Sequence, residues 1–173
     1  MRTLSRLAVA CVAAALIVVG LAARAEVSKT ETFVKAAGEA IIFQAQAARL
    51  ASGVSTNTEV KAFATTVLAD YSAAVTKFKQ ALGDTKTTGP SEELQGKLKD
   101  LLDKLKMAPT ANFDSAYVEA QVAMHRDMLV LFTDYAGSGE HPGLKKFATD
   151  FLLVLQDHQI RLEKLSKALP RPA

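Results

Sequence analysis

From Ser28 onward, apolar residues recur three and four positions apart, the spacing that places them on one face of an α-helix. Four long segments carry this pattern, at about 28–51, 58–83, 112–136 and 142–168. The alternation of apolar and polar residues that is typical of strands is missing from the sequence, and so is any repeat of 20 to 50 residues. The pattern therefore predicts an all-α protein.

Residues with helix-capping chemistry stand at the ends of these segments. Ser28 lies three residues before Glu31, which is the spacing of a capping box. The stretch "GVSTN" predicts a turn, after which Asn57 or Thr58 can cap the second helix. Pro142 suits the first turn of the fourth helix, and Pro170 ends it.

A different kind of segment joins the second and third helices. "GDTKTTGPS" has the composition of a turn, and residues 91–107 then place several leucines on one side. This predicts a short amphipathic connector helix that lies against the other four. Its mixed Lys and Asp/Glu residues argue against a role on a membrane surface.

These elements predict a four-helix bundle with a short connector helix between its second and third helices. Helices of about 25 residues are about 37 Å long and can bury their apolar faces together. The long middle connection is what a ferritin-like crossover requires, and the sequence leaves open whether the chain crosses over or runs simply up and down.

The first 25 residues have the pattern of a secretory signal peptide. Arg2 and Arg6 precede an apolar run of 17 residues, and Ala23-Arg24-Ala25 provides a cleavage site before Glu26. An uncleaved membrane anchor is the competing interpretation, because the run approaches the length of a spanning helix. We expect cleavage, which makes residues 1–25 the signal peptide, 26–173 the bundle domain and the periplasm the location.

Removal of this leader changes the charge of the protein. It contains three of the 21 Lys and Arg residues and none of the 18 Asp and Glu residues, so the remaining chain has 18 of each sign. A neutral chain without a basic stripe argues against nucleic-acid binding. The single cysteine leaves with the leader, so the core must stabilise the fold. We expect an unknown protein or envelope partner, and no stable membrane insertion after cleavage.

Two histidines interrupt the apolar faces of the last two helices. His125 lies among Val118, Val122, Leu129 and Phe132, and His158 has a similar apolar neighbourhood on its own helix. Tyr71 stands at a comparable height on the second helix. The matching position on the first helix is near Ile41, with Gln44 one turn further on. The sequence therefore predicts a polar Tyr–His–His layer at the middle of the bundle.

Three blocks of sequence resemble the domain-of-unknown-function family 4142, which comprises exported bacterial proteins of ferritin-like helical fold. They are "EVKAFATTVLADY", "FDSAYVEAQVAMH" and "LKKFATDFLLVLQDH". The resemblance covers nearly all of the mature chain and implies little about function. It implies a carboxylate near Ile41, an Asp-His pair at Asp70-Tyr71, and histidines at His125 and His158.

The chain departs from that pattern at two positions. Ile41 replaces the carboxylate, although a shift of one turn would bring Gln44 or Gln46 near, and Tyr71 replaces a histidine. A family-like metal site would keep His125 and His158, with Asp70 and Tyr71 as weaker candidates. Two strong ligands do not complete a zinc site, which normally has four. For Asp70 we favour a solvated acid beside the helix seam.

The residues therefore favour a structural role for the histidine layer. Motifs typical of di-iron sites, phosphate-binding loops, zinc proteases and cysteine nucleophiles are missing from the sequence. We expect a non-enzymatic periplasmic bundle that binds a partner or supports the envelope under stress, without a cofactor. The alternative is a metal- or small-ligand-binding protein of ferritin-like descent, with a transition metal ion in a partly lost histidine site.

Overall fold

The structure is a computed structural model that describes residues 4–83, 85, 89 and 91–169, with side chains from residue 29 onward. The described residues form five helices and no strand. The helices are α1 (Leu4–Val54), α2 (Thr58–Leu82), α3 (Gly96–Met107), α4 (Thr110–Ser138) and α5 (Pro142–Ala168). The prediction of an all-α fold is confirmed.

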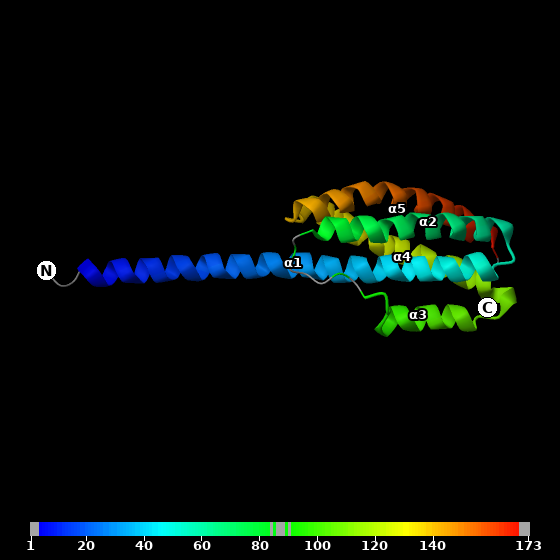
Figure 1. The fold of residues 1–173 in the computed structure, drawn as a ribbon, viewed down its shortest axis with the longest axis horizontal. Coiled ribbons are helices and arrows are strands. Elements are labelled where there is room, and N and C mark those ends of the chain that lie inside the picture. The colour runs from blue at the N-terminus through cyan, green and yellow to red at the C-terminus, as the bar shows by residue number, and fades with distance from the viewer. Residues whose placement is uncertain (1–3, 84, 86–88, 90, 170–173) are drawn as a thin grey trace.

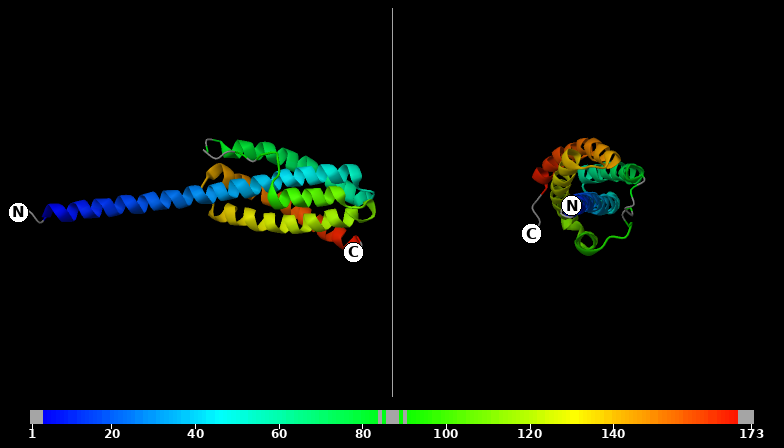
Figure 2. Two further views of the ribbon diagram at one scale, coloured as in Figure 1. Left: turned by 90° about the horizontal axis from the view of Figure 1, so that it is seen from below. Right: turned by 90° about the vertical axis from the view of Figure 1, so that its left-hand side faces the viewer.

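Four of the helices pack side by side around a shared core. α1 contacts α2 and α4, and α5 contacts the same two helices, so each helix has two neighbours. α1 and α5 run from left to right in Figure 1, whereas α2 and α4 run from right to left. Because α2 and α4 have the same direction, the chain between them must travel back along the bundle. α3 covers this distance outside the core, against α1 and α4 (Figure 2).

Local sequence explains where most of the helices begin and end. The Asn57 side chain accepts hydrogen bonds from the backbone N–H groups of Glu59 and Val60, at 2.9 and 3.1 Å, and so caps α2 as predicted. Gly83, at φ 45°, ends α2. His141 Nδ1 accepts from the Leu144 N–H at 3.2 Å, and Pro142 occupies the first turn of α5.

Four predicted boundaries were wrong. α1 does not end near Ala51 but continues through Gly53 to Val54. α1 does not begin at Ser28 but at Leu4, because residues 23–28 contain no glycine or proline that would interrupt the helix in the uncut chain. α4 continues through Gly137 to Ser138. The connector helix begins at Gly96 instead of residue 91, since Gly96 has a φ of 55°, which breaks the helical path before it.

The N-terminal part of α1 projects beyond the other helices (Figure 1). It includes most of the predicted leader, whose first three residues and all of whose side chains lie outside the described residues. Among the described residues, no helix combines the length and the apolar character needed to cross a membrane.

The core between the four packed helices contains mainly aromatic and small aliphatic side chains. Phe33, Phe132 and Tyr135 pack ring against ring at the end of the bundle where α1 enters. Towards the other end, Ala47, Ala48 and Ala51 of α1 are fully buried, which lets the neighbouring helices approach closely. The histidines lie between these two regions.

Candidate functional site: a buried tyrosine–histidine layer

The polar layer consists of one side chain from each of the four packed helices. Gln44 of α1, Tyr71 of α2 and His125 of α4 have no exposed surface, and His158 of α5 is 1% exposed. Each of them occupies an inward position of an otherwise apolar helix face, so helix packing brings them together. A fully buried polar side chain is costly unless it is hydrogen bonded, and the contacts within the layer are therefore decisive.

His125 is the centre of the layer. Its Nε2 atom lies 3.3 Å from His158 Nδ1 and 3.3 Å from the Tyr71 hydroxyl oxygen. Its Nδ1 atom lies 3.1 Å from the side-chain nitrogen of Gln44 and 3.0 Å from the backbone carbonyl oxygen of Gln121. Every ring nitrogen of His125 is therefore in contact with protein atoms.

Asp70 connects the layer to the surface of the protein. Its carboxylate lies 2.9 Å from Nε2 of His158, and its side chain is 40% exposed. From the sequence we favoured a solvated acid beside the helix seam for Asp70. In the structure Asp70 is partly exposed to solvent and also contacts His158 directly. Asp70 and Tyr71 are adjacent, so α2 points one towards His158 from the bundle edge and the other into the core.

The hydrogen positions on the two imidazole rings follow from their partners, because a neutral imidazole has one N–H and one acceptor nitrogen. A carboxylate only accepts, so His158 Nε2 donates to Asp70 and His158 Nδ1 is left as an acceptor. His125 Nε2–H can donate to that acceptor, while His125 Nδ1 accepts from the Gln44 amide. This tautomer gives a directional chain of hydrogen bonds from Gln44 to Asp70.

The backbone carbonyl of Gln121 favours the opposite tautomer of His125. A carbonyl oxygen also only accepts, so its contact with His125 Nδ1 requires a proton on that nitrogen. Two acceptor nitrogens, His125 Nε2 and His158 Nδ1, would then face each other across 3.3 Å. Their lone pairs repel unless a proton or a metal ion lies between them. The two tautomers thus differ in whether the layer needs a cation.

Burial keeps the ionisable groups of the layer neutral. Desolvation, and then the charge of His158, lowers the pKa of His125 to about 3. Desolvation also lowers the pKa of His158, although the hydrogen bond and charge of Asp70 oppose this. Burial raises the pKa of Tyr71 well above its usual value. At neutral pH the rings of the layer are therefore two neutral imidazoles and a phenol, and Asp70 lies at the outer end of the layer.

The structure brings together all four residues that the sequence selected: Asp70, Tyr71, His125 and His158. Ile41 is not part of the layer: it is buried in the hydrophobic core, and Gln44, one turn further on, supplies the contact from α1. Gln46 faces the connector instead, where its amide donates to the backbone carbonyl of Glu92 at 2.8 Å. The relative height of α1 and α4 determines that Gln44, and not Ile41 or Gln46, contacts His125.

Two further residues of the layer were not identified from the sequence. The Tyr71 hydroxyl lies 3.5 Å from Sδ of Met128, to which it can donate while its oxygen accepts from His125. Gln121 is fully buried, and neither polar atom of its side chain has a hydrogen-bond partner among the described residues. Its position four residues before His125 was the available signal, because this spacing places both on one helix face.

The described residues contain no group of three or more His, Cys, Asp and Glu side chains placed to hold a metal ion. Asp70 and the two histidines form a line instead of converging on one point, since Asp70 contacts the nitrogen of His158 that faces away from His125. What the geometry offers is two ring nitrogens and a phenol oxygen around one position.

Comparison with known proteins gives a family and no more. The family model described as "Domain of unknown function (DUF4142)" matches residues 19–165. Neither the curated proteins nor the solved structures contain a match to this chain.

Proposed function

The chain belongs to the domain-of-unknown-function family 4142, whose description specifies no activity, and we propose that it is an exported, periplasmic bundle that binds a ligand or partner and does not catalyse a reaction. Its helices form a ferritin-like four-helix frame with α3 as the crossover. The common direction of α2 and α4 supports this frame (Figure 1). The leader supports export, as its basic start, apolar run and Ala-Arg-Ala site are those of a signal peptide.

One observation carries the proposal that the histidine layer does not catalyse a reaction: the histidine pair is sealed from solvent. His125 is 0% and His158 1% exposed, and aromatic rings of Tyr71 and Phe63 pack against them. A general base must come within hydrogen-bond distance of the proton that it removes from a substrate. Here the protein itself occupies those positions. The histidine layer is therefore a structural element that fixes the relative height of four helices.

Binding would take place on the accessible surface instead. A groove of about 620 Å³ opens between α1, α2 and α3, away from the histidines. Its volume lies within the range of about 300–1,000 Å³ that is usual for small-molecule sites. The groove therefore has the size and accessibility that a binding function requires.

A second candidate function has its own observation in the layer. If His125 donates through Nδ1 to the Gln121 carbonyl, the free nitrogens of His125 and His158 converge at 3.3 Å. Two nitrogens bound to one tetrahedral ion at about 2.0–2.1 Å lie about 3.3–3.4 Å apart. Asp70 and the Gln121 carbonyl would orient the rings, as hydrogen-bond acceptors do around metal-bound histidines.

The donor set fits such an ion only in part. His125, His158 and the Tyr71 oxygen would hold it, but burial raises the pKa of Tyr71, which keeps the phenol protonated and weakens it as a ligand. A transition metal bound there would supply Lewis acidity or redox chemistry. We therefore rank this function second.

One experiment separates the two candidates. The mature protein, purified without an affinity tag, is analysed for metal, and the imidazole tautomers are determined by ¹⁵N NMR. The proposed function predicts a metal content far below one ion per chain and a proton on Nε2 of His125. One tightly bound ion per chain, lost in the His125→Gln/His158→Gln variant, would establish the second candidate.

Export requires a separate measurement. Mass spectrometry of protein from the native host should find a chain that begins at Glu26 in the periplasmic fraction. An intact N-terminus in the membrane fraction would contradict the proposed location.

A further inference from the structure

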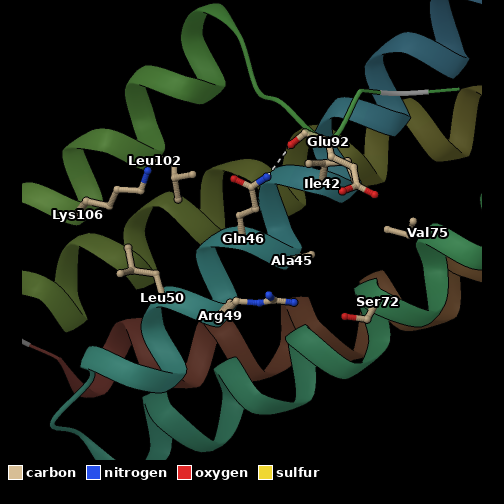
Figure 3. Close-up of a pocket in the computed structure, with 10 residues that line it drawn as sticks. All are labelled: Ile42, Ala45, Gln46, Arg49, Leu50, Ser72, Val75, Glu92, Leu102 and Lys106. Carbon is tan, nitrogen blue, oxygen red and sulfur yellow. Dashed lines mark hydrogen bonds between the residues drawn. The ribbon is translucent and has the colours of Figure 1, made fainter.

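The groove between α1, α2 and α3 combines an apolar surface with an unpaired positive charge. Its floor is one face of α1, on which Ile42, Ala45, Gln46, Arg49 and Leu50 follow one another at helical spacing. Ser72 and Val75 of α2 form one wall, and Leu102 and Lys106 of α3 form the other (Figure 3). The apolar residues among these surround the space on three sides.

The connector before α3 closes one end of the groove. The side-chain amide of Gln46 donates to the Glu92 carbonyl at 2.8 Å, which ties this stretch of the connector to α1 (Figure 3). The buried side chain of Leu102 holds α3 against the bundle at the other wall. The groove is therefore part of the folded architecture and does not need a ligand to form.

Arg49 provides the charge that has no counterpart. Its side chain is exposed and extends across the groove towards Ser72 (Figure 3). This side chain has no hydrogen bond or ion pair with any described residue, whereas the other charged side chains along the groove each have an ion-pair partner. Lys106 lies 3.1 Å from Asp103, and the Glu92 carboxylate lies 3.8 Å from Lys79.

A guanidinium beside apolar walls fits one class of ligand particularly well. Its planar donors match the two oxygens of a carboxylate, and the hydrogen bonds are strengthened by charge. The partly exposed side chains of Leu50 and Val75 would gain from covering an apolar chain. From Ile42 to Leu50 the floor is about 12 Å long. A groove of this length offers much less surface than the roughly 800 Å² that a protein partner usually covers.

We propose that this groove binds an aliphatic carboxylate of the fatty-acid class, with its carboxylate on Arg49 and its chain between α2 and α3. The proposal rests on the proposed binding function and specifies its ligand. Ser72 can add a hydroxyl hydrogen bond to the same carboxylate, since Arg49 extends towards it.

Isothermal titration calorimetry with decanoate, below its micelle concentration, tests the proposal on the full mature chain. Decanoate should bind with one site per chain. Arg49→Gln should weaken binding about tenfold or more, because it removes a charge-assisted contact. Arg126→Gln is the matched control: Arg126 is also exposed and unpaired among the described residues, but lies on α4, and its loss should leave binding unchanged.

A second variant blocks the site without removing the arginine. Ser72→Asp places a carboxylate opposite Arg49, where it should compete with the ligand and weaken binding to a similar extent. Both substituted side chains are exposed, so the variants should fold, and circular dichroism and thermal melts verify this.

Binding of other amphiphiles tests the chemical class of the ligand. Decyltrimethylammonium should bind at least about tenfold more weakly than decanoate, since its charge has the sign of Arg49. Failure of decanoate to bind, equal binding of the cationic amphiphile, stronger binding of decyl phosphate, or no effect of Arg49→Gln would each overturn the proposal. These results do not depend on the metal content or on the tautomer of His125. A wrong ligand class can therefore be distinguished from a wrong proposed function.

Discussion

The two buried histidines are the residues whose chemistry depends most on their surroundings. An imidazole in water titrates near pH 6.5, but burial among the side chains of four helices lowers the pKa of His125 to about 3. Asp70 on α2 and Arg161 on α5 act on His158 in opposite directions, and desolvation outweighs the carboxylate. Folding therefore favours the neutral form of both rings.

This preference predicts a loss of stability in acid. As the pH falls below about 6.5, the unfolded chain binds protons that the folded histidines do not, down to about pH 3 for His125. The free energy of unfolding should fall by about 1.4 kcal/mol per pH unit from His125 alone, and the lowered pKa of His158 acts in the same direction. Urea unfolding between pH 4 and pH 8 measures this slope.

The matched variants identify the groups responsible for the slope. His125→Gln/His158→Gln should flatten it. His141→Asn removes the third histidine, which lies outside the layer, keeps a side chain that can cap α5, and serves as the control for the loss of a histidine. If the double variant kept the full acid sensitivity, the histidines would not be its cause.

Gln121 provides a second test at the residue scale. Its buried amide has no partner among the described residues, so folding removes it from water without a compensating hydrogen bond. Gln121→Leu should therefore raise the free energy of unfolding, by about 1–3 kcal/mol, in denaturant titrations.

Gln44→Leu is the contrasting variant, since the Gln44 amide lies 3.1 Å from His125 Nδ1. It removes the donor that the Nε2–H tautomer of His125 requires, and should destabilise the protein by about 1–3 kcal/mol. Equal effects of the two substitutions would contradict the assigned hydrogen bonds.

At the scale of single elements, the caps determine where helices begin, and α2 is the clearest case. Asn57 accepts two backbone N–H groups that the helix cannot satisfy itself. Asn57→Ala should lower stability by about 0.5–2 kcal/mol. Asn112→Ala, in the first turn of α4, removes the same side chain from an exposed site where it does not cap, and should cost less than about 0.5 kcal/mol.

The stripes of apolar residues set which face of each helix is buried, and α5 allows a direct comparison. Leu155 is 0% exposed, whereas Leu153, two residues earlier, is 72% exposed. Leu155→Ala should cost about 2–5 kcal/mol in unfolding free energy, and Leu153→Ala less than about 0.5 kcal/mol. Similar costs for both would show that the face of α5 is assigned wrongly.

At the scale of the whole molecule, the crossover by α3 separates two regions with different roles. The histidine layer lies in the sealed core between the four packed helices, and the groove lies outside it, where α3 stands beside α1 (Figures 1 and 3). A chain that ran simply up and down would have no fifth helix at this position, and hence no second wall for the groove. The topology thus creates the proposed binding surface.

The sequence by itself determined the features that depend on local chemistry. The spacing of apolar residues fixed the helical class and the buried faces of the helices, and the Asn57 cap and Pro142 fixed two helix starts. It also selected Asp70, Tyr71, His125 and His158, because a polar side chain within an apolar stripe is visible at helical spacing. These signals act within one or two turns of the same helix.

Only the tertiary structure decided the relations between helices. The relative height of α1 and α4 placed Gln44, and not Ile41, against His125, and brought Met128 to Tyr71. The direction of α2 relative to α4 and the position of Arg49 opposite Ser72 likewise follow from packing. The physical reason is that a sliding of one helix by a single turn, about 5.4 Å, preserves every local pattern but exchanges all the partners across the interface.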